Sequence, residues 1–317
     1  MIIATIGLVS AEDDFTGLVE PHRRELRLHC YRMLGSLHDA EEVLQDTLLR
    51  AWKGRAGLGD PSRVRSWLYR IATNVCLDAL ANRSSRLLVA HEAPADPTLP
   101  VGPALNDEAW IEPAPASWLA DPSEHFSRRE RVSLAFVATL QLLTPVQRAV
   151  LLLREVVELS AAETADALDM NVGAVKSALF RAREALPAEL PNEFPGDATL
   201  LGKYVRAFEQ NDLPALVALL RDDIRTTMPP SPTWINGRDA NEEFYRRMFA
   251  ALARGAVRLV PAGANGQPAF GFYRATNGEA YRLRAIHVLT IASGLVAAID
   301  HFMMPKLGPL FGLRDVL

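Results

Sequence analysis

The segment that most restricts how this chain can fold is residues 87–125. They contain seven prolines and seven acidic residues but no lysine or arginine. Proline removes a backbone donor and breaks helices, so neither a long helix nor a central strand can run through this segment. The segment therefore predicts an extended acidic linker that separates a front domain from the rest of the chain. On composition alone, this linker could be a passive spacer.

The composition of the 317-residue chain narrows its class. Hydrophobic residues make up 49% and charged residues 23%, which excludes a mainly disordered chain. A net charge of −4 excludes a protein that holds DNA by bulk charge. Two cysteines are too few for a disulfide framework or a zinc site, so we expect a cytoplasmic protein without metal or other cofactor. No apolar run reaches the roughly 18 residues of a membrane span.

The front domain, residues 12–86, has helical periodicity and predicts three or more helices. Glycine and proline between residues 54 and 61 predict a loop before the third helix. The second helix begins with an acidic face, which consists of Asp39, Glu41, Glu42, Gln45 and Asp46. Acidic residues in a first turn also favour the helix dipole, so capping alone could explain them.

The third predicted helix begins after Ser62 and interleaves basic with aromatic residues. Its basic residues are Arg63, Arg65, Arg70, Arg83 and Arg86, and Trp67, Tyr69 and Asn74 lie among them. This pattern suits a surface that follows the backbone of single-stranded nucleic acid and stacks on its bases. A solvated helix face with buried aromatic rings would give the same pattern.

Residues 126–190 predict a second helical domain. Thr144 followed by Pro145 predicts the start of a helix. Ser160 with Glu163 predicts a capping box, and Asn171 predicts the cap of a last helix. Two short helices separated by a turn are typical of a helix-turn-helix. The last helix has the polar and basic face that a DNA-reading helix needs, although a helix-turn-helix can also be purely structural.

Three motifs in this order resemble those of the extracytoplasmic-function class of bacterial sigma-70 factors. The resemblance covers residues 12–190. The motifs are DAEEVLQDT (39–47) with AW (51–52), RSWLYRIATNVCLD (65–78), and LTPVQR (143–148) with VGAVKS (172–177) and RAR (181–183).

The resemblance implies a role for each motif. In that family the acidic helix docks on the β′ clamp helices of RNA polymerase, which implies polymerase binding by Asp39, Glu41, Glu42, Gln45 and Asp46. The second motif opens the −10 element and holds flipped bases, which implies DNA contacts for Arg65, Trp67, Arg70, Asn74, Asp78 and Arg83. The third motif reads the −35 element beside the β flap, which implies contacts for Lys176, Ser177, Phe180, Arg181 and Arg183. The linker would thread near the active centre, where its acidity mimics nucleic acid.

Residues 197–317 extend beyond such a two-domain factor. They predict a pair of amphipathic helices and then a mixture of strands and one helix. The expected strands span 222–228, 257–261, 269–274, 281–291 and 295–302, with a helix at 240–253 and a hairpin turn at 293–294. Helices followed by antiparallel strands predict an α+β domain.

This order resembles the SnoaL-like branch of the NTF2-like cone fold, which encloses an apolar pocket. The resemblance implies Met228, Trp234, His287 and Asp300 as pocket residues. Enzymes of this fold use an Asp/His pair for acid–base chemistry, and His301 is a further candidate. Adjacent residues of a regular strand point to opposite faces, so Asp300 and His301 cannot both enter one pocket. We therefore expect no catalytic residue, and a regulatory domain that could bind a small-molecule ligand.

The sequence thus predicts a multidomain protein. Two all-α domains, at 12–86 and 126–190, are joined by the linker at 87–125 and followed by an α+β, NTF2-like cone domain with a C-terminal tail at 197–317. We expect a sigma factor rather than an enzyme, which binds core RNA polymerase and promoter DNA, not a membrane, and is controlled by its own C-terminal domain. Two alternatives are an NTF2-like isomerase or cyclase tethered to DNA, and a dimeric helix-turn-helix repressor, which the acidic docking motif weakens.

Overall fold

The computed structural model divides into two compact units. The first contains Met1–Ser85 and Val137–Ala188, and the second contains Arg86–Glu124, Arg131–Phe136 and Glu189–Leu317. The described residues are 2–81, 86–88, 93–105, 110–119, 133–186, 198–276 and 279–317. The predicted −10 residue Arg83 and the expected joint at 187–197 lie outside them. None of the described helices is long and apolar enough to cross a membrane.

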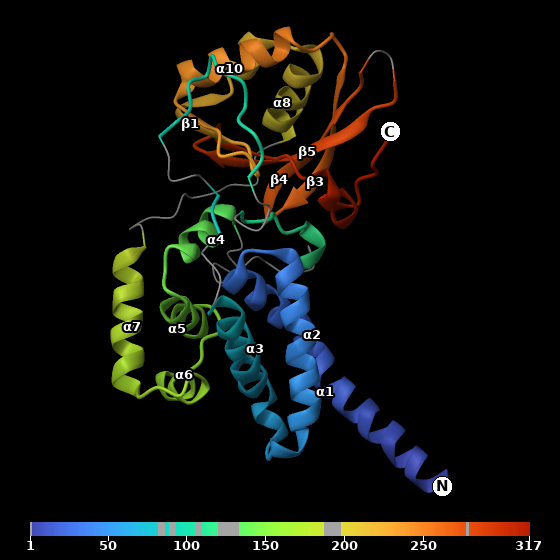
Figure 1. Cartoon of the computed structure of the whole chain (residues 1–317), viewed down its shortest axis with the longest axis vertical. Coiled ribbons are helices and arrows are strands. Elements are labelled where there is room, and N and C mark those ends of the chain that lie inside the picture. Colours follow the sequence, from blue (N-terminus) through green and yellow to red (C-terminus); the bar gives the residue numbers. More distant parts are fainter. Residues whose placement is uncertain are drawn as a thin grey trace. The chain divides into compact units, whose positions relative to one another are not determined.

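Three helices of the first unit pack against one another (Figure 1): α1 (Ile2–Leu34), α2 (Leu37–Gly54) and α3 (Val64–Leu80). Their shared core includes the buried side chains of Leu26, Leu44 and Leu68. The hydroxyl of Ser36 caps α2 by accepting a hydrogen bond from the Asp39 amide. The loop predicted at 54–61 contains one short 3-10 turn, Arg55–Gly57, and a second, Pro61–Arg63, begins at its end.

The predicted helix-turn-helix is present in the first unit. It follows α4 (Leu134–Gln141) and consists of α5 (Pro145–Glu155), α6 (Ala161–Ala167) and α7 (Val172–Ala185). The predicted caps are confirmed: Thr144 and Ser160 form capping boxes with Gln147 and Glu163, and Asn171 accepts from the amide of Ala174. A small apolar core of Val150, Ala165, Val175 and Ala178 holds the three helices together.

The second unit is built on one curved sheet of six strands in the order β2-β1-β6-β5-β4-β3. The strands are β1 (Leu220–Thr227), β2 (Trp234–Asn236), β3 (Val257–Ala264), β4 (Gln267–Arg274), β5 (Arg282–Ala292) and β6 (Leu295–Phe302). β1 and β6 are parallel and every other pair is antiparallel. The predicted turn at Ser293-Gly294 is confirmed, because both residues have the positive φ that a tight hairpin requires. The three-residue strand β2 was not predicted.

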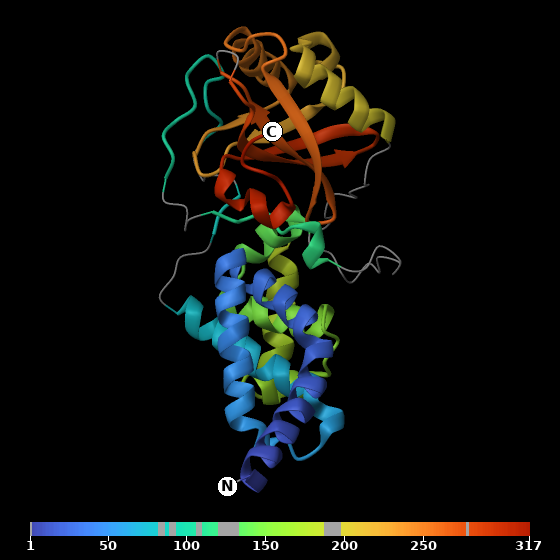
Figure 2. The ribbon, with the colours of Figure 1, turned by 90° about the vertical axis from the view of Figure 1, so that its right-hand side faces the viewer.

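Helices cover one face of this sheet. The helices α8 (Ala198–Gln210) and α10 (Arg238–Ala250) lie on the same side of it in both views (Figures 1 and 2), with the short α9 (Leu213–Val217) beside them. Aromatic side chains of α8 and α10, such as Phe208 and Tyr245, form the core together with Phe270 of β4.

The C-terminal tail packs on the opposite face. Side chains alternate along a strand, so Gly271 and Tyr273 of β4 point away from Phe270. A Cβ added to Gly271 would lie 2.8 Å from Leu313, and Tyr273 donates to the carbonyl oxygen of Arg314 (2.6 Å). The tail, which includes the 3-10 helix η6 (Pro305–Phe311), is therefore an integral part of the domain.

Candidate nucleic-acid interface and ligand cavity

The predicted polymerase-docking residues share one helix, α2, but differ in exposure. Glu42 and Gln45 are exposed, Glu41 and Asp46 are half-buried, and Asp39 in the first turn is buried. Arg27 contacts Glu41 (3.4 Å), and Arg50 contacts Asp46 (2.9 Å). The part of this acidic face that is open to a partner therefore centres on Glu42 and Gln45.

The helix α3 carries the predicted −10 residues, and three of them contact the helix-turn-helix. The contacts join Arg65 to the carbonyl oxygen of Val157 (3.1 Å), Arg70 to the carboxylates of Asp166 and Asp169 (3.4 and 3.6 Å), and Asn74 to the carbonyl oxygen of Ala167 (3.3 Å). Trp67 and Arg70 also line a groove of about 310 Å³ that α6 closes from the other side. This face of α3 is consequently covered by the second helical domain.

The last of the described −10 residues, Asp78, lies apart from this contact. It is exposed near the end of α3 and pairs with Arg50 (3.1 Å), the same arginine that holds Asp46 of α2. The hydrogen bonds that Arg50 donates to the carboxylates of Asp78 and Asp46 raise its pKa, and the bond to Asp78 contributes most. Asp78 thus links the predicted docking helix to the predicted −10 helix.

The predicted −35 residues all lie on α7 and are all exposed. They are Lys176, Ser177, Phe180, Arg181 and Arg183. Arg183 forms an ion pair with Glu155 of α5, whereas Phe180 presents 62% of its surface to solvent. The opposite face of α7, with Val175 and Ala178, belongs to the core. The helix therefore presents an exposed, mainly polar and basic face that also carries the ring of Phe180.

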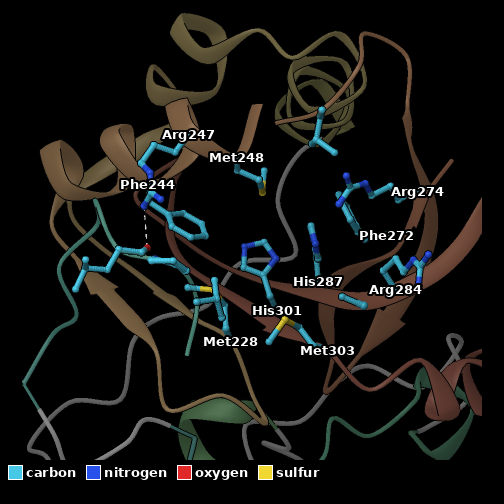
Figure 3. Close-up of a pocket in the computed structure, with 15 residues that line it drawn as sticks. Met228, Phe244, Arg247, Met248, Phe272, Arg274, Arg284, His287, His301 and Met303 are labelled. Carbon is cyan, nitrogen blue, oxygen red and sulfur yellow. Dashed lines mark hydrogen bonds between the residues drawn. The ribbon is translucent and has the colours of Figure 1, made fainter. Parts of the chain in front are cut away.

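The second unit contains a cavity of about 390 Å³ between the sheet and α10. Figure 3 shows His287 and His301 at its centre, Arg274 and Arg284 together on one side, and Phe244 with Arg247 on the other. The full lining is Leu99, Pro100, Val101, Met228, Phe244, Arg247, Met248, Leu252, Phe272, Arg274, Arg284, Ala285, His287, His301 and Met303. No carboxylate is among these described lining residues.

The two histidines of the cavity are neutral and held by tyrosines. Their ring centroids are 4.0 Å apart. A nitrogen of His287 lies 3.2 Å from the Tyr204 hydroxyl, and one of His301 lies 2.9 Å from the Tyr245 hydroxyl. Burial lowers the pKa of His301 to about 3 and, together with the nearby His301, lowers the pKa of His287 well below its ordinary value. Burial also raises the pKa of both tyrosines, so they keep their protons.

Two of the four predicted pocket residues line the cavity and two do not. Met228 and His287 line it, whereas Trp234 of β2 and Asp300 of β6 are not among its lining residues. Asp300 accepts a hydrogen bond from Thr227 (2.7 Å), while its neighbour His301 enters the cavity. The alternation of side chains along β6 explains this separation. Burial raises the pKa of Asp300.

Sequence reasoning missed the arginines of the cavity and the part that the linker plays in it. The arginines carry no periodic signal, and an extended proline-rich segment does not show what it lies against. Residues 93–105 run along the α10 side of the second unit (Figure 1). Their residues Leu99, Pro100 and Val101 complete the cavity wall.

Hydrogen bonds hold the linker on the second unit at two places. Near the cavity, the Arg247 side chain donates to the carbonyl oxygens of Pro97 and Leu99 (3.0 and 2.8 Å). Three linker amides donate in the other direction, each over 2.8 Å: Ala95 to the Trp234 carbonyl, Gly102 to the Thr233 hydroxyl and Leu105 to the Pro230 carbonyl. At the β3–β4 turn, Ala114 exchanges two bonds with Asn265, through its amide (2.7 Å) and its carbonyl (2.8 Å). The described linker residues are therefore bound to this domain.

Within the described ranges, no group of three or more His, Cys, Asp or Glu side chains is placed to hold a metal ion. The cavity offers arginines and neutral imidazoles beside apolar side chains. Such a wall can bind an organic molecule, and it contains no acid–base pair of a carboxylate with a histidine.

Comparison with known proteins agrees with this architecture. Family models match at residues 18–86 (Sigma-70 region 2), 133–186 (Sigma-70, region 4) and 201–299 (SnoaL-like domain). The ECF RNA polymerase sigma factor SigG of Mycobacterium tuberculosis is 42% identical over 96% of this chain and 85% of its own length. SigJ of the same species is 26% identical over 88% of each chain. The crystal structure of SigJ matches 95% of this chain and 99% of its own with a TM-score of 0.64 and 24% identity, which shows the shared fold.

The alignment with SigG covers 96% of this chain and so includes all three predicted domains. The three family models match in the order that the sequence predicts. The resemblance and the fold class predicted from the sequence are confirmed. This chain is a member of the ECF family of RNA polymerase sigma factors, and it carries a SnoaL-like domain after its two sigma regions.

Proposed function

We propose that this sigma factor recruits core RNA polymerase through the β′ clamp helices and the β flap, and directs it to promoters whose −35 element α7 reads. The observation that carries the proposal is the exposed face of α7, where Lys176, Arg181 and Arg183 stand on a capped helix-turn-helix. A recognition helix needs such a face in the major groove, where arginine and lysine bond to guanine edges.

Polymerase docking is proposed for the exposed part of the acidic face of α2. Glu42 and Gln45 are open to solvent, so they can meet a basic partner without any change in the fold. Asp39 is buried in the first turn, and its substitution would disturb the helix itself. Complementary charge at an interface mainly sets encounter rate and specificity, while like charges oppose binding.

The fused domain is proposed to control the factor by retaining the linker. The family resemblance implies that the linker enters the polymerase, but residues 93–105 and 110–119 are bound to the SnoaL-like domain. The −10 face of α3 is covered as well, through Arg65, Arg70 and Asn74. This arrangement supports a resting state in which neither the linker nor α3 is available to polymerase and promoter.

A binding role rather than catalysis is proposed for the SnoaL-like domain. Acid–base chemistry needs groups within hydrogen-bond reach of the substrate. Asp300 is not among the cavity residues and is engaged by Thr227, and the lowered pKa of both cavity histidines makes them weak general bases. The residues of the cavity therefore favour a regulatory ligand over a substrate.

Reconstitution with core RNA polymerase tests the function. Run-off transcription from a promoter library should require this protein, and the double variant Glu42→Lys/Gln45→Lys should reduce binding to core enzyme at least about tenfold, because it places like charges at the interface. The control, Glu279→Lys, reverses an exposed charge in the SnoaL-like domain and should bind normally. Normal polymerase binding by the double variant, or no binding by the native chain at low salt, would overturn the proposal.

A further inference from the structure

The cavity of the SnoaL-like domain combines an apolar interior with a positive rim. The interior is formed by Met228, Phe244, Met248, Leu252, Phe272 and Met303. Methionine side chains are flexible and adapt to ligands of irregular shape. Cavities of roughly 300 Å³ and above accept small molecules, and this one of about 390 Å³ persists with the linker in place. A ligand can therefore lie beneath the linker instead of replacing it.

The rim carries two arginines from neighbouring strands, Arg274 of β4 and Arg284 of β5. Both are exposed, and Figure 3 places them together on one side of the cavity. Among the described residues, neither forms an ion pair, and no carboxylate lines the cavity with them. Two guanidinium groups at the edge of an apolar cavity match a carboxylate, which arginine binds through paired hydrogen bonds.

The opposite side of the cavity is closed by the linker. Leu99, Pro100 and Val101 complete the wall there, and Arg247 fixes them through the carbonyl oxygens of Pro97 and Leu99. An apolar body that fills the cavity would contact Leu99 and Val101, whose side chains are otherwise 60% and 37% exposed. Covering these side chains is favourable because it removes apolar surface from water.

We propose that this cavity binds an amphipathic carboxylate, with its apolar body beneath residues 97–101 and its carboxylate at Arg274 and Arg284, and that the bound molecule fastens the linker to the domain. The consequence for transcription rests on the proposed control through the linker; the binding and the fastening do not. Because affinity coupling is reciprocal, a molecule that binds more tightly under a docked linker must also make the linker dock more tightly.

The ligand chemistry can be tested with decanoate, and with decanol as its uncharged match. Calorimetry on the full chain should show decanoate binding at least about tenfold more tightly than decanol, because each guanidinium–carboxylate bond is charge-assisted. The double variant Arg274→Gln/Arg284→Gln should lose this preference and keep its affinity for decanol. Equal binding of the two probes to the native chain, or no decanoate binding at its solubility limit, would overturn the proposal.

The fastening of the linker can be tested by hydrogen exchange. The amides of Ala95, Gly102 and Leu105 donate hydrogen bonds to the domain, so saturating decanoate should slow exchange in residues 93–105 several-fold. The variant Arg247→Gln should exchange faster even without ligand, while the adjacent Arg246→Gln, which only breaks exposed pairs with Glu242 and Glu243, should not.

Unchanged or faster exchange with bound decanoate would overturn the fastening, since it would mean that the ligand ignores or displaces the linker. Run-off transcription separates this result from the proposed function. Slower exchange without a change in transcription would support ligand binding and the fastening of the linker, and it would contradict control of transcription through the linker.

Discussion

Arg148 illustrates how one residue joins the two sigma regions within the first unit. Its side chain is fully buried, and its guanidinium donates to the carbonyl oxygens of Leu140 (2.8 Å) and Met33, the latter at the end of α1. Burial lowers the pKa of Arg148 to about 10, so the group stays charged at neutral pH. The carbonyl groups at the ends of α1 and α4 are satisfied by a side chain, as helix ends require.

We expect Arg148→Met to destabilise the helical unit by about 3 kcal/mol, because it leaves several buried carbonyl oxygens without a donor. Urea unfolding followed by circular dichroism measures the loss. The control Arg181→Met changes an exposed arginine on α7 and should cost less than about 0.5 kcal/mol. An Arg148→Met protein as stable as the native chain would show that water replaces the guanidinium.

The buried histidines predict a dependence of stability on pH. An unfolded chain binds protons at His287 and His301 near pH 6.5, but in the folded domain the pKa of His301 is only about 3 and that of His287 is also lowered. Each histidine therefore lowers the free energy of unfolding by about 1.4 kcal/mol per pH unit as the pH falls from about 6.5 toward these lowered pKa values. Asp300 acts in the opposite direction, because its pKa is raised and the folded state takes up its proton first.

The variant His301→Gln should show a smaller loss of stability between pH 6.5 and 4.5 than the native domain, by up to about 1.4 kcal/mol per pH unit. A glutamine amide can still form a hydrogen bond with the Tyr245 hydroxyl, so the comparison isolates the proton. Denaturant midpoints at several pH values measure the slope. An identical slope in both proteins would show that His301 takes up its proton in the folded domain as readily as in the unfolded chain.

Among the elements, α6 contacts the face of α3 for which we propose −10 recognition. The ion pairs of Arg70 with Asp166 and Asp169 are largely exposed, so each contributes less than about 1 kcal/mol. We expect Asp166→Asn/Asp169→Asn to loosen this contact and raise run-off transcription about threefold. The control Glu243→Gln breaks an exposed pair in the other unit and should change nothing. Lower transcription would mean that α6 needs these carboxylates in the open complex.

The helix α7, for which we propose −35 recognition, provides a second prediction. We expect Arg181→Ala to weaken −35 recognition by about 1–3 kcal/mol at one base position, as loss of a paired contact to guanine does. Arg183 is held by Glu155, so Arg183→Ala should act less on sequence preference. Competition binding across −35 variants measures both. Equal weakening on every sequence would identify Arg181 as a phosphate contact.

Elements that depend on neighbours in the chain were predictable from the sequence, and those that depend on distant contacts were not. The caps at Thr144, Ser160 and Asn171 lie within three residues of their partners, so a local pattern is sufficient. β2 exists because residues 234–236 pair with β1, and three residues carry no periodic signal. The cover over α3 and the arginines of the cavity are likewise set by residues far away in the sequence.

At the scale of the whole molecule, the linker connects the two sigma regions and is bound to a third domain. It follows α3 in the chain and precedes α4, so under the proposed control its release would act on both sigma regions through the backbone. The second site of retention is the β3–β4 turn, where Pro115 pairs with Ala264. A Cβ added to Gly263 would lie 2.9 Å from the Cβ of Ala116, so no larger residue fits there while the linker is docked.

We therefore expect Gly263→Val to displace residues 110–119 and to raise run-off transcription. Valine suits a strand, so the domain itself should keep its stability. If the free energy that holds the linker on the domain falls by about 1 kcal/mol, the population with a released linker grows about fivefold. The control Gly202→Ala on α8 adds a Cβ in ordinary contact distance of Arg206 and should leave transcription unchanged. Lower transcription by Gly263→Val, with normal polymerase binding, would show that the docked linker is the active arrangement and that the SnoaL-like domain braces the factor.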